Sequence, residues 1–346
     1  METKLWIVDN YVDKNEKYPQ ITQAAQLLKE GEVVAFPTET VYGLGADATC
    51  DRAVEKIFKA KGRPSDNPLI VHIAEREQLQ ALVGQISQKA EVLMDRFWPG
   101  PLTLIFKKKE GLSKLVTAGL DTVAVRMPDH PVAHSLIKES GLPIAAPSAN
   151  TSGKPSPTLA DHVKRDLYGK IAGIVDGGET GVGLESTVVD CTESIPVILR
   201  PGGITKEQLE ETIGEVKIDA ALQNEKEAPK SPGMKYTHYA PAASLTLVKG
   251  HPSFIQEQIN QSKEKGLQVG VLTTEENQSF YQADHIETVG TAAHLETVAA
   301  KLYEALRNFD DQNVDVIFGE VFPEVGIGQA IMNRLMKAAG HRIIEE

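Results

Sequence analysis

Hydrophobic residues in the first two hundred positions alternate between short apolar runs and helix-like spacing. Apolar residues in 21–29 and 51–59 recur at intervals of three and four, which predicts two amphipathic helices. Residues 33–36 form an apolar run that ends at Pro37, which predicts a buried strand followed by a loop over 38–45. Further apolar runs predict strands at 69–73, 102–106, 123–126, 144–146, 171–175, 186–190 and 197–199. This alternation predicts an α/β domain with a twisted mixed sheet over residues 1–210.

The pattern stops after residue 210 and starts again at residue 244. Residues 211–229 are polar, charged and poor in aromatic residues, so we place a linker over 211–243. Within it, residues 231–241 carry two tyrosines, a histidine and a lysine between prolines, which predicts an ordered loop. From residue 244, apolar runs alternate with amphipathic stretches, which predicts a smaller, parallel-sheet, Rossmann-like domain over 244–346. The predicted strands there are 245–248, 269–273, 285–289 and 314–318, and the predicted helices are 252–265, 292–309 and 327–339.

Composition narrows the class of protein. Hydrophobic residues make up 41% and charged residues 24% of the chain, which is typical of a soluble globular protein. No run of eighteen apolar residues predicts a membrane span, and the first residues lack the features of a signal peptide, so we expect a cytoplasmic protein. Cys50 and Cys191 are isolated, which argues against a disulfide framework and against a zinc site.

Charge is unevenly distributed along a chain whose net charge is −12. Residues 50–126 carry thirteen Lys and Arg against nine Asp and Glu, whereas residues 244–346 carry eight against fifteen. An acidic protein does not bind nucleic acid through its overall field. The basic stretch nevertheless keeps a weak contact with RNA open.

The first candidate for chemistry is a group of three cations, Lys59, Lys61 and Arg63. The sequence contains no P-loop, no protein-kinase signature and no nucleophile elbow, so a nucleotide site would have to be built differently. If the chain is extended here, Lys61 and Arg63 share a face and meet one polyphosphate. The alternative is a helix end whose cations favour the helix dipole.

Similar residues recur where other predicted strands end. Ser148 and Asn150 follow one strand, in a segment that also fits an ordinary turn. Arg126 ends an apolar strand, and a buried arginine needs an anionic partner from the protein or from a ligand. His72, inside an apolar strand, fits a core histidine as well as a ligand contact.

Two later segments add to the same pattern. A glycine-rich loop precedes Ser186, and Arg200 ends the strand predicted at 197–199. Because so many strand ends carry hydroxyl groups or cations, we infer one site. It would hold a phosphate-bearing ligand and a smaller anionic or amino-acid-like partner.

These motifs resemble the threonylcarbamoyl-AMP synthase family in its long form, a YrdC-like domain followed by a Rossmann-like domain. The resemblance rests on Pro-Thr-Glu-Thr-Val-Tyr-Gly-Leu-Gly at 37–45, Lys-Gly-Arg at 61–63, Ser-Ala-Asn at 148–150 and the loop at 231–241. It implies a nucleotidyltransferase that converts L-threonine, bicarbonate and ATP to threonylcarbamoyl-AMP and pyrophosphate. Downstream tRNA threonylcarbamoyl-transferase proteins would then modify the adenosine just 3′ of the anticodon.

The resemblance also implies which residues bind the substrates. Threonine would be held by Thr40, His72, Arg126, Ala146 and Ser186. ATP would be held by Arg63, Asn67, Thr122, Ser148, Ser156, Arg200 and Tyr239. No side chain is assigned a catalytic role or a metal, and the implied Mg²⁺ would be carried by the phosphates of ATP. We expect the loop at 231–241 and the acidic second domain to close as a lid over a reactive mixed anhydride.

Two other functions remain open from the sequence alone. One is an RNA-binding module that uses the basic face of the first domain, for which binding would fall steeply with salt and ignore ATP. The other is a carbamoyl or adenylyl transferase on the same domain whose substrate is not threonine. Exchanging the amino acid in the assay separates that case.

Overall fold

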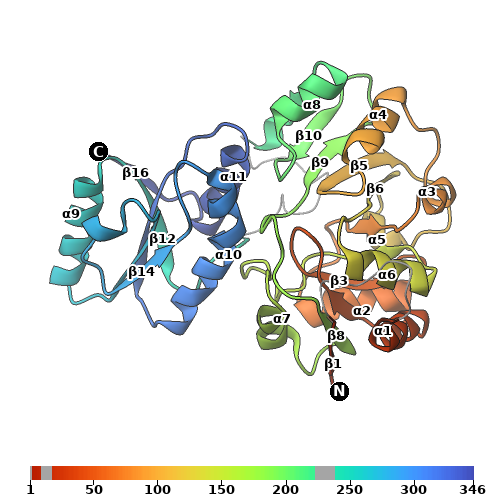
Figure 1. The fold of residues 1–346 in the computed structure, drawn as a ribbon, viewed down its shortest axis with the longest axis horizontal. Coiled ribbons are helices and arrows are strands. Elements are labelled where there is room, and N and C mark those ends of the chain that lie inside the picture. The colour runs from red at the N-terminus through yellow and green to blue at the C-terminus, as the bar shows by residue number, and fades with distance from the viewer. Residues whose placement is uncertain (1, 9–17, 223–237) are drawn as a thin grey trace. The chain divides into compact units, whose positions relative to one another are not determined.

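The computed structural model describes residues 2–8, 18–222 and 238–346, which divide into two compact units. The first unit comprises Met1–Ser152, Pro157–Gly181 and Glu185–Lys235. The second comprises Tyr236–Glu346 together with two short segments, Gly153–Ser156 and Val182–Leu184. Each unit has its own sheet and its own helices (Figure 1).

Strands among the described residues of the first unit form one eleven-stranded mixed sheet, in the order β1-β8-β2-β3-β7-β4-β6-β5-β9-β10-β11. The bounds are β1 Lys4–Ile7, β2 Val34–Phe36, β3 Gly43–Asp47, β4 Ile70–His72, β5 Leu102–Lys107, β6 Thr122–Arg126, β7 Ile144–Ala145, β8 Gly173–Asp176, β9 Thr187–Asp190, β10 Val197–Arg200 and β11 Lys217–Ile218. The sheet contains parallel pairs, such as β4–β6 and β5–β9, and antiparallel pairs, such as β4–β7 and β5–β6. The predicted mixed sheet is thereby confirmed.

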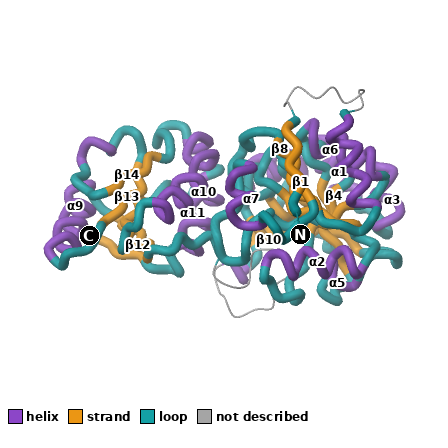
Figure 2. The backbone as a smooth tube through the Cα atoms, turned by 90° about the horizontal axis from the view of Figure 1, so that it is seen from below, coloured by secondary structure: helices purple, strands orange, loops and turns teal. Residues whose placement is uncertain are grey.

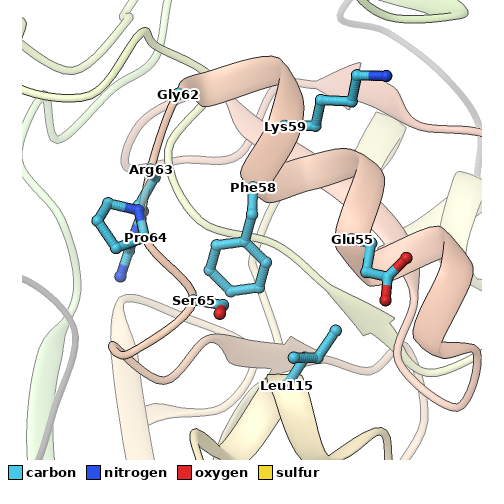
Figure 3. Close-up of a pocket in the computed structure, with 8 residues that line it drawn as sticks. All are labelled: Glu55, Phe58, Lys59, Gly62, Arg63, Pro64, Ser65 and Leu115. Carbon is cyan, nitrogen blue, oxygen red and sulfur yellow. The ribbon is translucent and has the colours of Figure 1, made fainter.

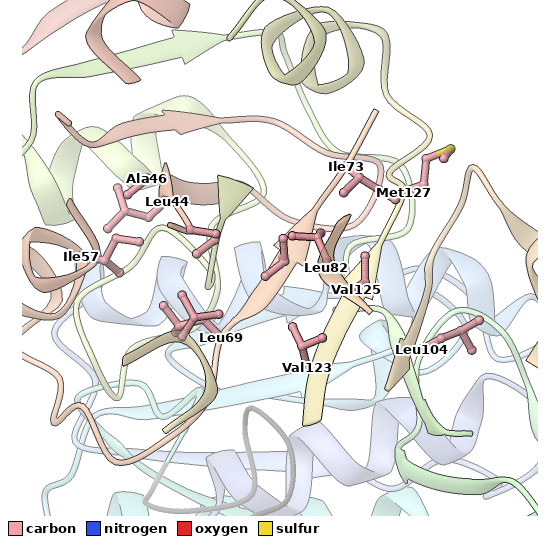
Figure 4. Packing of buried hydrophobic residues seen from close by; sticks show 14 of the residues in the cluster. Leu44, Ala46, Ile57, Leu69, Ile73, Leu82, Leu104, Val123, Val125 and Met127 are labelled. Carbon is pink, nitrogen blue, oxygen red and sulfur yellow. The ribbon is translucent and has the colours of Figure 1, made fainter. Parts of the chain in front are cut away.

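Helices cover the sheet because alternate residues of its strands face opposite sides. On β2, Ala35 enters a large core with α2, whereas Val34 and Phe36 enter a second core with α1 and α6. Figure 4 shows part of the large core, and Figure 2 shows the helices around the strands. The helices are α1 Pro19–Lys29, α2 Asp51–Lys61, α3 Arg76–Leu82, α4 Gln88–Phe97, α5 Lys114–Thr117, α6 Pro131–Ser140, α7 Ala160–Leu167 and α8 Lys206–Ile213, with a 3-10 turn, η1, at Ala220–Leu222.

The second unit contains a five-stranded sheet in which each pair of neighbours is parallel, in the order β14-β13-β15-β12-β16. This confirms the predicted parallel, Rossmann-like fold. Its elements are β12 Ser244–Lys249, α9 Pro252–Glu264, β13 Val269–Thr273, η2 Gln278–Phe280, β14 His285–Thr288, α10 Leu295–Asp311, β15 Val316–Glu320, α11 Gly328–Ala338 and β16 Ile343–Glu345. No helix in the described part of the chain is both long enough and apolar enough to cross a bilayer.

The structure departs from the sequence prediction in the first motif. Residues 43–47 form β3, which pairs with β2, although a loop was predicted over 38–45. The pairing depends on Gly45, where a Cβ atom would lie 2.7 Å from the ring of Phe36. A short strand rich in glycine lacks the apolar alternation by which strands are recognised in a sequence.

The boundary predicted at residue 210 also differs from the structure. Helix α8 continues to Ile213, and β11 pairs in parallel with β10, so the first unit keeps secondary structure inside the predicted linker. The polar composition of 211–218 reflects the end of a partly exposed helix and a strand at the sheet edge. Strands β1 and β16 were likewise not predicted.

Candidate functional site

Three polar residues form a row across neighbouring strands of the first unit. His72 on β4 is paired with Arg126 on β6, and Arg126 is paired with Thr103 on β5. Because directly paired residues project from the same face of a sheet, the three side chains share one face. All three are buried. The strands at the centre of the sheet therefore present a cation, an imidazole and a hydroxyl side by side.

Arg126 lies against Glu39, which comes from the loop between β2 and β3. Their closest nitrogen and oxygen atoms are 2.6 Å apart, and the two side chains are 4% and 14% exposed. The two carboxylate oxygens of Glu39 and the Nη2 atom of Arg126 have no partner with hydrogen-bond geometry. The contact between the two side chains is therefore an ion pair without a hydrogen bond. A buried guanidinium requires such a counter-charge. The protein carboxylate thus occupies the position where an anionic ligand would meet Arg126.

Two threonines shape the loop that carries Glu39. The Oγ1 atom of Thr38 accepts hydrogen bonds from the backbone N–H groups of Thr40 and Val41, at 3.1 and 3.3 Å. It also lies 2.8 Å from Thr40 Oγ1, which accepts a hydrogen bond from Arg126 Nη1 at 2.8 Å. The loop is therefore built around buried hydroxyl groups, and it places Thr40 against the guanidinium.

His72 is 3% exposed, and its protonation is set by its surroundings. Burial, followed by the positive charges of Arg126 and Arg200, lowers the pKa of His72 to about 3. The imidazole is therefore neutral at physiological pH, and its Nδ1 lies 3.3 Å from the carbonyl oxygen of Ile70. A neutral imidazole can donate one hydrogen bond and accept another without adding a further charge to the site. His72 is both a buried histidine and a member of the site.

Arg200 extends the row on the other side. Its Nε and Nη2 atoms donate to the carbonyl and the hydroxyl oxygen of Ser186, each at 3.1 Å, and Ser186 Oγ lies 2.8 Å from Thr103 Oγ1. Gly202 lets the chain turn back here, because a Cβ atom at that position would lie 2.3 Å from Thr187 N. Arg200, expected to hold ATP, therefore lies beside Ser186, expected to hold threonine.

Ala146 and Ser148 follow β7 and are held by the same strands. The N–H of Ala146 donates to the carbonyl oxygen of Ile70 at 2.9 Å, and Ser148 forms an isolated bridge with Gly43. These contacts attach the turn at 147–150 to β4 and β3.

Lys61 follows the second of the two alternatives left open by the sequence, a helix end and not an extended chain. It is the last residue of α2, and Gly62 ends the helix in the left-handed region with φ 62°. Lys61 is 2% exposed, and its Nζ donates to the carbonyl oxygens of Ser148 and Asn150, the latter at 2.6 Å. At this helix end Lys61 and Arg63 do not share a face. Lys61 fastens the turn at 147–150 to α2.

Arg63 lies on the wall of a cavity of about 520 Å³ at the end of α2 (Figure 3). Its Nη2 donates to the carbonyl oxygen of Asn67 at 3.4 Å. The cavity is lined by Glu55, Phe58, Lys59, Gly62, Arg63, Pro64, Ser65 and Leu115. In Figure 3 the Lys59 side chain points away from Arg63. These two members of the predicted group of cations therefore do not meet.

Asn67 is fully buried, yet neither Oδ1 nor Nδ2 of its side chain has a hydrogen-bond partner. Leaving a buried amide unpaired costs about 1–3 kcal/mol, so such groups are rare in folded proteins. An amide of this kind offers a donor and an acceptor to a ligand. Asn67 and Arg63 are therefore the residues near α2 whose environment most favours a ligand.

The remaining expected ATP residues are more dispersed. Thr122 begins β6 and is paired with Lys107, so about 13 Å of strand separates it from Arg126. Ser156 and Tyr239 belong to the second unit, where both are buried. Of the predicted loop at 231–241, residues 231–237 lie outside the described residues.

Three residues of the site were not singled out from the sequence as ligand contacts. Glu39 stands inside a quoted motif, and its place between two threonines was the available signal. Thr38 and Thr103 lie in or beside apolar runs, where a hydroxyl at an alternate position gives only a weak signal. Their role becomes visible once the strands are paired, because the register places Thr103 beside Arg126.

Comparisons with known proteins cover nearly the whole chain. A family described as Telomere recombination, comprising Sua5, YciO and YrdC proteins, matches residues 26–202, and the C-terminal domain of threonylcarbamoyl-AMP synthase matches residues 204–340. The chain is 62% identical to the threonylcarbamoyl-AMP synthase of Bacillus subtilis over 345 residues, which cover 99% of this chain and 100% of that protein.

A solved structure and a shorter relative are also similar to this chain. The crystal structure of Pyrococcus abyssi Sua5 in complex with L-threonine matches with a TM-score of 0.94 and 50% identity, over 99% of this chain and 100% of that one. A putative threonylcarbamoyl-AMP synthase of Mycobacterium tuberculosis is 37% identical over 209 residues, which cover 60% of this chain and 94% of that protein.

Proposed function

Because the chain belongs to the threonylcarbamoyl-AMP synthase family, we propose that it converts L-threonine, bicarbonate and ATP to L-threonylcarbamoyladenylate and pyrophosphate. The observation that carries the proposal is the buried Arg126 in contact with Glu39, beside the neutral His72 and two hydroxyl groups. The product would be used by tRNA threonylcarbamoyl-transferase proteins to modify the adenosine just 3′ of the anticodon. The protein would accordingly be a nucleotidyltransferase.

The charges around Arg126 are complementary to an amino acid. The ion pair of Arg126 and Glu39 consists of one positive and one negative group within contact distance, which matches the carboxylate and ammonium of a zwitterion. On binding, the substrate carboxylate would take over the guanidinium, while Glu39 would face the ammonium group. Thr40, Ala146 and Ser186 would complete the enclosure. The threonine hydroxyl would find partners among the buried hydroxyl groups and His72.

The nucleotide would use the cations and the unpaired amide nearer α2. Arg63 offers a planar fork for phosphate oxygens, and Asn67 offers a buried donor and acceptor. Ser148 lies on the turn that Lys61 fastens. Arg200 contacts Ser186, which lies on the other side of Arg126 in the strand order. Thr122, and Ser156 and Tyr239 of the second unit, would complete the nucleotide site as the resemblance implies.

The chemistry would depend on alignment of the substrates and not on a protein nucleophile. The threonine amine would first form a carbamate, either from bicarbonate with loss of water or from CO₂ with loss of a proton. A carbamate oxygen would then attack the α-phosphorus of ATP and displace pyrophosphate. Holding two reactants in line lowers a barrier by about 7–11 kcal/mol. The guanidinium groups would stabilise the charge that develops on the phosphates.

Magnesium would enter with ATP and neutralise phosphate charge. We assign the ion to the substrate phosphates and to no protein side chain, because Mg²⁺ is commonly bound through phosphates. The residues of the chain would bind around that complex and exclude water from the mixed anhydride.

Pyrophosphate release tests the proposal. The purified protein is incubated with ATP, Mg²⁺ and bicarbonate, with and without L-threonine, and L-serine and L-valine serve as matched amino acids. Release that requires both threonine and bicarbonate supports the synthase. Turnover of ATP that is indifferent to the amino acid would refute the threonine assignment, and RNA binding that is salt-sensitive without any turnover would favour an RNA-binding module.

A further inference from the structure

Helix α10 of the second unit presents one continuous face to segments from three separate parts of the chain. Ala300, Tyr303, Arg307 and Asp310 recur at intervals of three and four residues, so they lie along one side of the helix. The segments in contact with this face are 153–156, 182–184 and 239–242, all of which belong to the second unit. Two of them contain residues expected to bind ATP.

The contact with residues 153–156 is made by the side chain of Arg307, which is 6% exposed. Its Nε and Nη2 atoms donate to the carbonyl oxygen of Pro155, at 3.1 and 2.6 Å. A charged fork on one carbonyl fixes the backbone immediately before Ser156. In the same segment, the carbonyl oxygen of Gly153 accepts a hydrogen bond from the N–H of Ala240 at 3.0 Å. This bond connects residues 153–156 to the segment that contains Tyr239.

Tyr239 is held in a backbone conformation that it would not adopt freely. Its φ is 66°, in the left-handed region, which costs a residue other than glycine free energy and persists only where the surroundings enforce it. The ring stacks on Tyr303 with centroids 5.2 Å apart and planes 26° apart. The guanidinium of Arg334, a fully buried residue of α11, lies 5.7 Å from the centroid of the Tyr239 ring. Aromatic and cationic contacts therefore hold the ring from two helices.

The other two contacts are made by the backbone. Gly183 packs directly on the helix, because a Cβ atom there would lie 2.4 Å from Ala300 Cα. Asp310 accepts a hydrogen bond from the N–H of Ala242 at 2.7 Å. The whole length of the helix face is thus used to hold chain segments, and none of these contacts is required to form the five-stranded sheet.

From these contacts we infer that the face of α10, with Arg334, positions Ser156 and Tyr239 for the nucleotide, so that Tyr303, Arg307 and Arg334 are positioning residues for ATP. The inference rests on the proposed function for the role of Ser156 and Tyr239. It assigns the second unit a task more specific than a lid: it sets the affinity for ATP and leaves the affinity for threonine unchanged.

The test compares Arg307→Met with a matched variant, Arg342→Met. Arg342 is also an arginine of the second unit, and it donates to a backbone carbonyl, that of Leu245, at 3.1 Å, but it does not contact α10's partner segments. Arg307→Lys and Tyr303→Phe keep a donor and an aromatic ring respectively, and Tyr303→Leu removes the ring. Equilibrium binding of radiolabelled ATP, the KM values for ATP and threonine, and the midpoint of thermal unfolding are measured for each variant.

Arg307→Met is expected to weaken ATP binding about tenfold, the size expected for lost hydrogen bonds from a charged group. Tyr303→Leu is expected to weaken it by up to about tenfold, through the lost stacking on Tyr239. The KM for threonine should change by less than about twofold, the Lys and Phe variants should retain most of the affinity, and Arg342→Met should match the parent protein. Equal losses in Arg307→Met and Arg342→Met, or equal changes in both KM values, would overturn the inference. If the parent protein does not use threonine, the proposed function fails, while the ATP binding comparison still decides the role of α10.

Discussion

Replacing Arg126 with methionine should weaken threonine far more than ATP. Methionine keeps most of the buried volume but removes the charge and the donors that contact Thr40, Glu39 and the carbonyl oxygen of Gly100. A substrate carboxylate would lose two charge-assisted hydrogen bonds, each contributing about 1.5–3 kcal/mol, so at least ~3 kcal/mol is at stake. That corresponds to a KM for threonine raised more than about a hundredfold, with the KM for ATP little changed.

The same substitution also affects stability, because it leaves Glu39 without its counter-charge. Breaking a buried pair typically costs about 3–5 kcal/mol, and the 14% exposure of Glu39 places the expected loss at the lower end. The double variant Arg126→Met/Glu39→Gln removes the stranded charge, so its unfolding midpoint should return toward that of the parent while threonine affinity stays lost. Steady-state pyrophosphate release and thermal unfolding measure both effects. The reasoning would be refuted if the double variant regained threonine affinity, or if Arg126→Met changed both KM values equally.

Three further substitutions test other parts of the site. Asn67→Leu should weaken ATP about tenfold without lowering the unfolding midpoint of the ligand-free protein, because it removes a buried amide that has no partner; a lower midpoint with ATP affinity intact would contradict this. The pKa of His72 is about 3 in the folded protein against an ordinary value of about 6.5. The contribution of His72 to the free energy of unfolding is therefore complete above pH 6.5 and declines as the pH falls toward 3. At pH 5.5 the loss is about 1.4 kcal/mol. Denaturant titrations of the parent and of His72→Gln should therefore converge as the pH is lowered, and parallel pH profiles would exclude this origin. Lys61→Met should lower both stability and ATP affinity through the turn at 147–150, whereas the exposed Lys59→Met should be silent in both measurements.

The elements with clear periodicity were predictable from the sequence. The apolar runs that became β4, β5 and β6, and the helical spacing of α2, are strong signals because burial on one face leaves a fixed period. Strand β3 was missed because Gly43 and Gly45 carry no side chain to reveal a period. Strands β1, β11 and β16 are short or lie at a sheet edge, where exposure weakens the apolar pattern.

In the candidate site, features that depend on one segment could be predicted from the sequence, whereas contacts between distant segments could not. Arg126 could be singled out because a charge inside an apolar strand is unusual, but its partner Glu39 lies 87 positions earlier in the chain and only the fold brings them together. Of the two alternatives for Lys61, the structure shows the helix end, since α2 runs two residues beyond the predicted helix and Lys61 contacts the turn at 147–150. Register, which places Thr103 beside Arg126, cannot be derived from either strand alone.

Two segments of the second unit lie within the sequence of the first, and this limits how the two units can be exchanged between proteins. Residues 153–156 and 182–184 are encoded among the residues of the first unit, yet they pack with α10, so the border between the units does not coincide with any single cut in the chain. A chimera that joined this C-terminal half to the first domain of another protein would need a carbonyl oxygen for Arg307 and a glycine against Ala300 in the foreign half. The two units therefore cannot be exchanged by a single crossover. A chimera that preserves these contacts has to transfer residues 153–156, 182–184 and 236–346 together.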